Sequence, residues 1–255
     1  MNKIFFVIIF LFGLSNTSFS LTFSNGSQVD IQWEISCGVD KGSIIIDGND
    51  YTFKESSNLC DGNKNKWSWK QRSELISNKI SINSKDKYLF KSKISFLSES
   101  KNKFTFFQIH DGRDACAPPL KVDWDNRGLI KFYSHYKVKG KGEEYCIPNY
   151  ELIKAPLIQT KYLKRDGTEY DIEIIIDFDG QGNFDVLVKV DEEDALKGRY
   201  NSSQKFDKVK TEGGLTVKNP NLQKSTKFDF KHGNYSKDFF EYTLISNGMS
   251  ITKID

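Results

Sequence analysis

The chain has 255 residues, of which 37 are lysine or arginine and 34 are aspartate or glutamate, and its formal net charge is +3. This excess of positive charge is too small to indicate a nucleic-acid partner. No internal repeat and no low-complexity linker divides the sequence, so we expect one folded domain after a short leader segment.

The N-terminus has the pattern of a secretory signal peptide. Met1-Asn2-Lys3 is followed by an apolar run from Ile4 to Leu14, and small or polar residues lead to Ser20. The run is too short to span a bilayer, and the small residues Ser18 and Ser20, at positions −3 and −1, suit cleavage after Ser20. We therefore predict a signal peptide over residues 1–20, a mature domain over 21–255, a secreted or periplasmic location and no stable membrane insertion. A retained anchor helix is the alternative.

Four cysteines, Cys37, Cys60, Cys116 and Cys146, are an even number in a chain expected to be exported. Disulfides are the default in that setting. Three pairings are open, and we favour Cys37–Cys60 with Cys116–Cys146 because these close the smaller loops. The spacing matches no zinc pattern, so we expect no metal site.

Short alternating runs rich in Ile, Val, Phe and Tyr fill the chain, and Gly, Asn and Asp clusters separate them. This pattern predicts β-strands, and many short strands at this spacing favour an all-β sandwich or jelly roll. The turn at 179–183 is a hairpin signal. The predicted strands cover residues 29–35, 42–46, 67–75, 88–96, 103–110, 129–136, 170–178, 184–190 and 227–231.

Three of these segments gather polar side chains on one face, because successive strand residues point to opposite sides. The shared faces are expected to hold Lys70, Arg72 and Glu74 in the first segment, Gln108 and His110 in the second, and Lys231, Gly233 and Tyr235 in the third. Trp67, Trp69 and Gln71 are expected on the opposite face of the first segment, and His232 should face away from Lys231 and Tyr235.

The same three segments resemble the signature strands of jelly-roll polysaccharide lyases. They read Gln71-Arg72-Ser73-Glu74-Leu75, Gln108-Ile109-His110 and Phe230-Lys231-His232-Gly233-Asn234-Tyr235. The alginate lyases of polysaccharide lyase family 7 are similar, with R-[ST]-E-L, Q-[IV]-H and Y-F-K-x-G-x-Y strands in this order. The stretch from Gln108 to Arg113, with Pro118-Pro119-Leu120 after it, looks closer to the glucuronan lyase and heparin lyase I group. Ser236 stands where a glutamine often follows the tyrosine in alginate lyases, which leaves the polymer open.

The resemblance implies a concanavalin A-like jelly-roll β-sandwich with a concave substrate-binding sheet. It also implies an enzyme that cleaves a uronate-containing polysaccharide, such as glucuronan, alginate or a heparin-like polymer, by β-elimination. We expect a monomer that needs no obligatory cofactor and whose partner is the acidic polysaccharide.

The residue types suit this chemistry, which removes a proton next to a sugar carboxylate and therefore needs that carboxylate neutralised. Arg72 offers a bidentate fork and Gln108 an amide donor. His110, with an ordinary pKa of about 6.5, can be neutral and basic near neutral pH. A nearby Lys231 or Arg72 is expected to lower the pKa of Tyr235. By resemblance, Tyr235 protonates the leaving group and is a candidate base, and His110 is the base or a neutralising partner.

Lys70, Glu74 and Lys231 are expected to line the substrate subsites. Glu74 could instead only orient Arg72, since an ion pair on a solvated strand face is the ordinary role of such a couple.

Two other functional classes compete with a lyase. The segment Glu169-Tyr170-Asp171-Ile172-Glu173 resembles the E-x-D-x-E strand of family 16 glycoside hydrolases, whose paired carboxylates act as nucleophile and acid/base. We read these acids as the polar face of an outer strand. The second competing class is a non-catalytic carbohydrate-binding jelly roll.

A calcium loop could also be drawn from Asp177, Asp179 and Asp185, but a hairpin turn is favoured over it.

Overall fold

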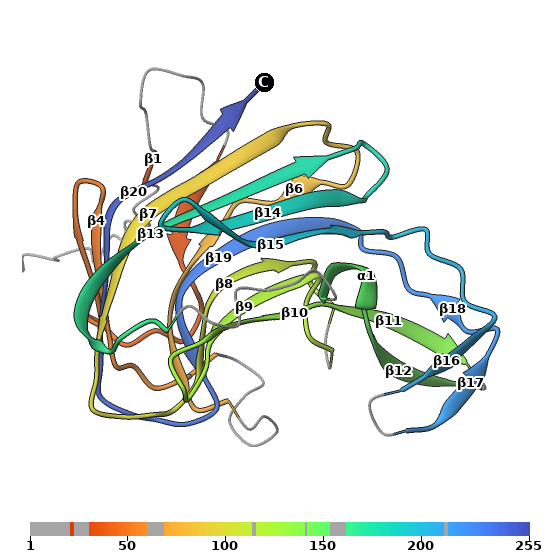
Figure 1. The fold of residues 1–255 in the computed structure, drawn as a ribbon, viewed down its shortest axis with the longest axis horizontal. Coiled ribbons are helices and arrows are strands. Elements are labelled where there is room, and N and C mark those ends of the chain that lie inside the picture. The colour runs from red at the N-terminus through yellow and green to blue at the C-terminus, as the bar shows by residue number, and fades with distance from the viewer. Residues whose placement is uncertain are drawn as a thin grey trace, which may run out of the picture.

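A computed structural model describes residues 21–22, 31–60, 69–113, 116–140, 142–153, 162–211 and 214–255. Within these residues every strand pairing is antiparallel, and two large sheets lie face to face (Figure 1). The predicted all-β jelly-roll sandwich is therefore confirmed. The predicted signal peptide over residues 1–20 lies outside the described residues.

One large sheet, the inner sheet, presents a concave open face, and the other, the outer sheet, covers its back (Figure 1). The inner sheet has the order β1 (Leu21–Thr22), β2 (Gln32–Ile35), β5 (Gln71–Ser77), β19 (Lys227–Ser236), β8 (Phe104–His110), β9 (Leu120–Trp124) and β10 (Ile130–Tyr133), with β6 (Ile80–Ser81) paired to β19. The outer sheet has the order β15 (Glu193–Tyr200), β14 (Phe184–Val190), β13 (Asp166–Phe178), β7 (Lys87–Leu97), β20 (Thr243–Ile254), β4 (Asp50–Lys54) and β3 (Ile44–Asp47).

Smaller elements flank one end of the inner sheet (Figure 1). They are a sheet of β12 (Glu143–Pro148), β11 (His135–Gly140) and β18 (Asn221–Leu222), a hairpin of β16 (Lys208–Lys210) and β17 (Thr216–Lys218), and the one-turn helix α1 (Tyr150–Ile153).

The core lies between the two large sheets and is rich in aromatic rings. Phe90 of β7 packs against Phe107 of β8 with ring centroids 5.0 Å apart. His232 of β19 also lies in this core, fully buried, with its Nε2 2.6 Å from Ser246 Oγ and its ring edge-on to Phe53. Because side chains alternate along a strand, the neighbours Lys231 and Gly233 belong to the opposite, open face. The predicted orientation of His232 is confirmed.

Each predicted strand has a counterpart, although several ends differ. The run over 129–136 is split at Ser134 into β10 and β11, because the chain leaves the inner sheet there and pairs with β12. The long strand β20 was not predicted from the sequence. Its alternation is broken near Gly248, where its register with β7 shifts.

Both favoured disulfides are present. Cys37 pairs with Cys60 at a Cα–Cα distance of 5.0 Å, and Cys116 pairs with Cys146 at 5.5 Å. The first joins the segment after β2 to the segment before β5, and the second joins the loop after β8 to β12. Two disulfides are consistent with an exported protein.

Candidate active site

Strand order and register bring the predicted residues together on the open face of the inner sheet. Tyr235 of β19 is directly opposite Arg72 of β5. On the other side of β19, Lys231 is opposite Gln108 of β8. Directly opposed residues point to the same side of a sheet, so these four side chains share the concave face.

Gly233 allows this arrangement of β19. Its φ of +137° and its position next to β5 leave no room for a side chain, since a Cβ would lie 2.2 Å from the carbonyl oxygen of Ser73. The register between β19 and β8 shifts between His232 and Tyr235, which marks a bulge. The glycine therefore permits the close approach of β19 to β5, in whose register Tyr235 is opposite Arg72.

Glu74 joins two of the predicted site residues. Its Oε1 accepts a hydrogen bond from Gln108 Nε2 at 2.6 Å, and its Oε2 lies 3.7 Å from Arg72 Nε. Glu74 is 1% exposed, so its carboxylate faces protein rather than solvent. In this position it orients Gln108 and Arg72 and offers little surface to a ligand.

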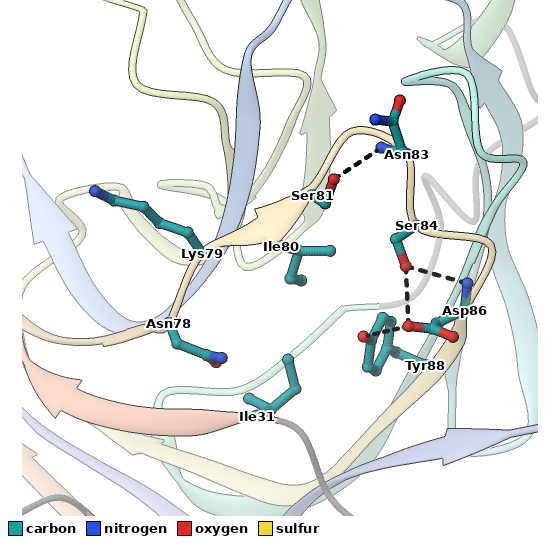
Figure 2. A pocket seen from close by; sticks show the side chains of 9 residues that line it. All are labelled: Ile31, Asn78, Lys79, Ile80, Ser81, Asn83, Ser84, Asp86 and Tyr88. Atoms are coloured by element: carbon teal, nitrogen blue, oxygen red, sulfur yellow. Dashed lines mark hydrogen bonds between the residues drawn. The ribbon is translucent and has the colours of Figure 1, made fainter.

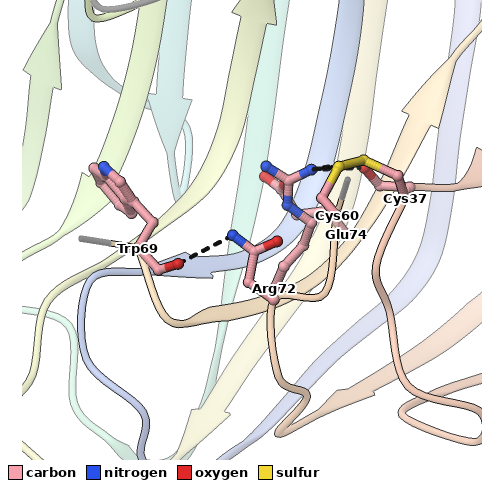
Figure 3. Close-up of a disulfide and its surroundings, with 7 residues drawn as sticks. Cys37, Cys60, Trp69, Arg72 and Glu74 are labelled. Carbon is pink, nitrogen blue, oxygen red and sulfur yellow. Dashed lines mark hydrogen bonds and ion pairs between the residues drawn. A yellow bond between two sulfur atoms is a disulfide. The ribbon is translucent and has the colours of Figure 1, made fainter. Parts of the chain in front are cut away.

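The Arg72 guanidinium is held on several sides. Its Nη1 lies 3.2 Å from Cys37 Sγ and 3.6 Å from Cys60 Sγ, so the side chain ends against the first disulfide (Figure 3). Its Cζ lies 4.6 Å from the centroid of the Tyr235 ring. These contacts fix the cation over the tyrosine, with only a small exposed fraction left for a bound anion.

Tyr235 is half-buried between aromatic and cationic neighbours. The Trp69 ring stacks on it with centroids 4.4 Å apart. Burial raises the pKa of Tyr235, and the charge of Arg72 opposes that rise without cancelling it. The expectation of a lowered tyrosine pKa is therefore wrong, because desolvation of the phenolate outweighs the attraction of the nearby cation.

His110 ends β8 on the same face. Burial lowers its pKa to about 3, and the charges of Lys231 and Arg72 act in the same direction. Its Nδ1 accepts a hydrogen bond from the backbone N–H of Gly112 at 2.9 Å. A neutral imidazole whose Nδ1 accepts carries its proton on Nε2, so His110 is a hydrogen-bond donor through Nε2.

Lys231 and Asp229 complete this part of the face. Lys231 is 9% exposed, and burial lowers its pKa. Asp229, which no sequence motif singled out, lies opposite His110 in the register of β19 and β8. Burial raises the pKa of Asp229 to about 6 against the opposing charge of Lys231.

The first polar segment differs from its predicted pattern. Trp69 and Lys70 precede β5, which begins at Gln71, so strict alternation does not extend to them. Trp69 lies with Tyr235 on the open face, contrary to the prediction, whereas Lys70 is exposed and its backbone N–H donates to Ser236. Trp67 lies outside the described residues.

Two further residues of the open face, Lys121 of β9 and Tyr133 of β10, also lacked a motif. Lys121 lies opposite Gln108 and Tyr133 opposite Lys121 in the strand register.

The acids of the glycoside hydrolase alternative lie elsewhere. Asp171 and Glu173 belong to β13 of the outer sheet and form ion pairs with Lys93 and Lys91 of β7, while Glu169 accepts a hydrogen bond from Asn247. They form the polar face of an outer strand, as predicted. The alternative is not supported, because these acids lie on the outer sheet and not on the open face of the inner sheet.

The segment weighed as a calcium loop is a hairpin turn, as predicted. Asp179 accepts backbone hydrogen bonds from Gln181 and Asn183, and Arg199 pairs with both Asp179 and Asp185. Within the described part of the chain no three His, Cys, Asp or Glu side chains are grouped to hold a metal ion.

A separate hollow of about 280 Å³ lies beside β6 and the start of β7 (Figure 2). Its lining includes Ile80, Ser84, Asp86 and Tyr88, and the hydroxyls of Ser84 and Tyr88 donate to Asp86. None of the predicted site residues lines it. In the part of the chain that the structure describes, no helix is long and apolar enough to cross a membrane.

No protein-family model and no curated protein matches the chain. Several solved structures are similar to it, among them alginate lyases. AlgAT5 from polysaccharide lyase family 7 shares 14% identity at a TM-score of 0.47, covering 88% of this chain and 94% of that chain. The alginate lyase from Alteromonas sp. 272 shares 11% identity at 0.48, covering 87% and 94%, and one from Pseudomonas aeruginosa shares 13% at 0.47, covering 84% and 87%. With identities this low and TM-scores below 0.5, these likenesses carry no conclusion about the activity of this chain, and they do not single out the glucuronan and heparin lyases that the residues after His110 suggested.

Proposed function

We propose that the protein is an exported polysaccharide lyase that cleaves a uronate-containing polymer by β-elimination at the open face of the inner sheet. The observation that supports this most directly is the shared face of Arg72, Gln108, His110 and Tyr235, contributed by three neighbouring strands. A carbohydrate-binding module needs rings and donors, but it has no use for a tyrosine hydroxyl placed beside a fixed guanidinium.

The reaction would proceed in three steps: removal of a proton, elimination and protonation of the leaving group. A base removes the proton on C5, next to the sugar carboxylate, and the charge spreads into that carboxylate as an enolate. The electron pair then forms the C4–C5 double bond, the C4–O bond breaks, and the leaving oxygen takes a proton. Donors and cations around the carboxylate stabilise the intermediate charge.

Three residues supply that stabilisation in our assignment. Arg72 presents the part of its guanidinium that Glu74 and the disulfide do not engage. Gln108 keeps one amide hydrogen beyond the bond to Glu74. His110 donates through Nε2, because Gly112 engages Nδ1. His110 is therefore assigned as a neutralising donor and not as the base.

Tyr235 is assigned to move the proton in both directions. Its ionised minority form takes the C5 proton, and the resulting phenol returns a proton to the leaving oxygen. Burial disfavours the phenolate, and Arg72 above the ring reduces that penalty. Activity is therefore expected to rise with pH on the alkaline side.

The test is incubation of the purified mature protein with alginate, glucuronan and a heparin-type polymer. A lyase releases an unsaturated uronate that absorbs ultraviolet light. New reducing ends without this chromophore would identify a hydrolase, and retention of the polymer without cleavage would identify a binding module. Either of these two outcomes overturns the proposal. Expression with residues 1–20 intact, followed by N-terminal sequencing of exported protein, tests the predicted cut after Ser20.

A further inference from the structure

Cationic and aromatic side chains contact one another in a row across the open face, starting at Arg72 and extending away from it. We call this set the cation–ring row. Arg72 lies 4.6 Å from the Tyr235 ring centroid, Tyr235 stacks on Trp69 at 4.4 Å, and Lys121 Nζ lies 4.9 Å from the Trp69 centroid and 4.8 Å from that of Tyr133. Lys103 Nζ, 5.6 Å from the Tyr133 centroid, ends the row.

Lys121 is the member of the row whose surroundings a purely structural role explains least well. It is 8% exposed, and its Nζ is 3.2 Å from Asp123 Oδ2. A buried lysine with one acidic partner is a common internal ion pair. That explanation accounts for Asp123, but it does not account for two aromatic rings whose centroids lie 4.9 Å and 4.8 Å from the ammonium on a concave face.

Further cations gather around the same two rings. Lys237 Nζ lies 5.7 Å from the Trp69 centroid, and both Lys237 and Lys103 are exposed. No ion pair is found for either lysine among the residues that the structure describes. Exposed cations over half-buried rings attract an anion and leave an apolar ring edge beside it.

A hollow adjoins the far end of the row. Its volume is about 440 Å³, and its lining includes Lys101, Lys103, Lys131 and Tyr133. Asp125 and Asp238 also line it, and Asp125 pairs with Lys131 at 3.1 Å. The remaining lysines give this end of the face an excess of positive charge.

We propose that Trp69, Lys121 and Tyr133, with Lys103 at the rim, form a distal subsite for an acidic sugar of the same polysaccharide chain. Pyranose rings have an apolar face that packs on aromatic side chains, and the sugar carboxylate pairs with a lysine. The strands β19, β8, β9 and β10 are adjacent, so at a spacing of about 4.8 Å per strand Tyr133 is roughly 14 Å from the strand of Tyr235. A sugar at Tyr133 is therefore a different unit from the one cleaved at Tyr235.

This inference rests on the proposed function, since it names further contacts of that substrate. It predicts that binding is stronger for long acidic chains than for short ones. The test compares wild-type protein with a Tyr133→Ala/Lys103→Ala double variant, using polymannuronate, polyguluronate and polyglucuronate as long chains and as trimers. Lys93→Ala, on the outer sheet with a side chain that is 61% exposed, removes one positive charge as a control.

The double variant should raise KM for the cleaved long polymer by about tenfold, change kcat by less than about twofold and leave KM for the trimer unchanged. An unchanged KM for the long polymer, or an equal loss for trimer and polymer, would overturn the subsite. Lys93→Ala should match the wild type for all substrates.

Binding separates the subsite from the lyase proposal. Affinity electrophoresis of Tyr235→Phe protein in gels that contain one of the three polymers, or neutral dextran, requires no turnover. Retardation by an acidic polymer that falls with Tyr133→Ala/Lys103→Ala supports the subsite even if no polymer is cleaved, in which case only the lyase proposal fails. Equal retardation with and without the double substitution, or equal retardation by dextran, overturns the subsite.

Discussion

The backbone N–H of Gly112 donates to Nδ1 of His110 across 2.9 Å, from two residues further along the chain. Gly112 adopts φ +75°, a conformation that suits glycine, and this lets the loop turn back on the ring. The bond and the pKa of about 3 agree, since both disfavour the imidazolium. The ring is thereby fixed as a neutral donor at Nε2 throughout the neutral pH range.

A glutamine should replace His110 better than an alanine does. Glutamine retains an N–H donor, whereas alanine leaves the sugar carboxylate without that partner, so we expect His110→Ala to lower kcat by about 10²-fold to 10³-fold and His110→Gln by roughly tenfold. Steady-state kinetics on the cleaved polymer would measure this. The acidic limb of the kcat/KM profile should be the same in His110→Gln as in the wild type. Loss of that limb would show that His110 titrates as the base.

His135→Ala provides a comparison on a buried histidine of β11, which is outside the site residues. The folded fraction of this variant should keep near-normal kcat, even if the variant is less stable.

Tyr235→Phe should remove almost all turnover and leave polymer binding largely intact. Phenylalanine keeps the ring that stacks on Trp69 and lies beneath Arg72, so the loss reports the hydroxyl alone. Loss of a general acid–base group predicts a fall in kcat of about 10²-fold to 10⁴-fold. In the wild type, kcat should rise between neutral and alkaline pH, because burial keeps the pKa of Tyr235 above its ordinary value. A phenylalanine variant with near-normal rates would discard this role.

The Cys37–Cys60 disulfide should matter for catalysis beyond its effect on stability. Cys37→Ser/Cys60→Ser is expected to lower the free energy of unfolding by about 2–4 kcal/mol, and so is Cys116→Ser/Cys146→Ser, because the two loops have similar separations of 23 and 30 residues. Only the first disulfide touches Arg72. At a temperature well below both unfolding transitions, the first variant should therefore lose more kcat than the second. Equal losses would mean that the disulfide does not position Arg72.

The open face was predictable from sequence where the strands are regular. Alternation along β5 and β19 placed Arg72 and Tyr235 on one side, and the register puts them directly opposite each other. The same rule failed for Trp69, because regular strand geometry starts only at Gln71. The family-like motifs located three strands of the site, but motifs of a few residues contain no information about what surrounds them.

The remaining features depend on contacts between distant segments. Lys121 and Tyr133 join the face only because β9 and β10 continue the inner sheet beyond β8, and no local pattern specifies that order. The predicted direction of the Tyr235 pKa shift is wrong for a related reason. The motif shows the nearby cation, which lowers the pKa, but the burial that raises it is a property of the folded sandwich. No sequence pattern indicates Asp229 for the same reason, since the burial of a single aspartate in a strand depends on its surroundings in the fold.

Asp229 leads to a prediction about stability. It is 4% exposed, its Oδ1 has no hydrogen-bond partner among the described residues, and burial raises its pKa to about 6. The folded state therefore binds a proton more tightly than the unfolded state, whose aspartate titrates near pH 3.9. The stability associated with this protonation is present below the unfolded pKa and is lost as the pH rises through about 6.

Asp229→Asn avoids the cost of the buried charge. The free energy of unfolding of the variant should therefore exceed that of the wild type by about 2–3 kcal/mol at most near pH 8 and by much less near pH 4. Urea unfolding at both pH values measures the difference, with the exposed Glu241→Gln as a control that removes a carboxylate without a buried charge. If the difference in unfolding free energy between Asp229→Asn and the wild type did not change with pH, burial would not penalise the charged form of Asp229 in the folded protein.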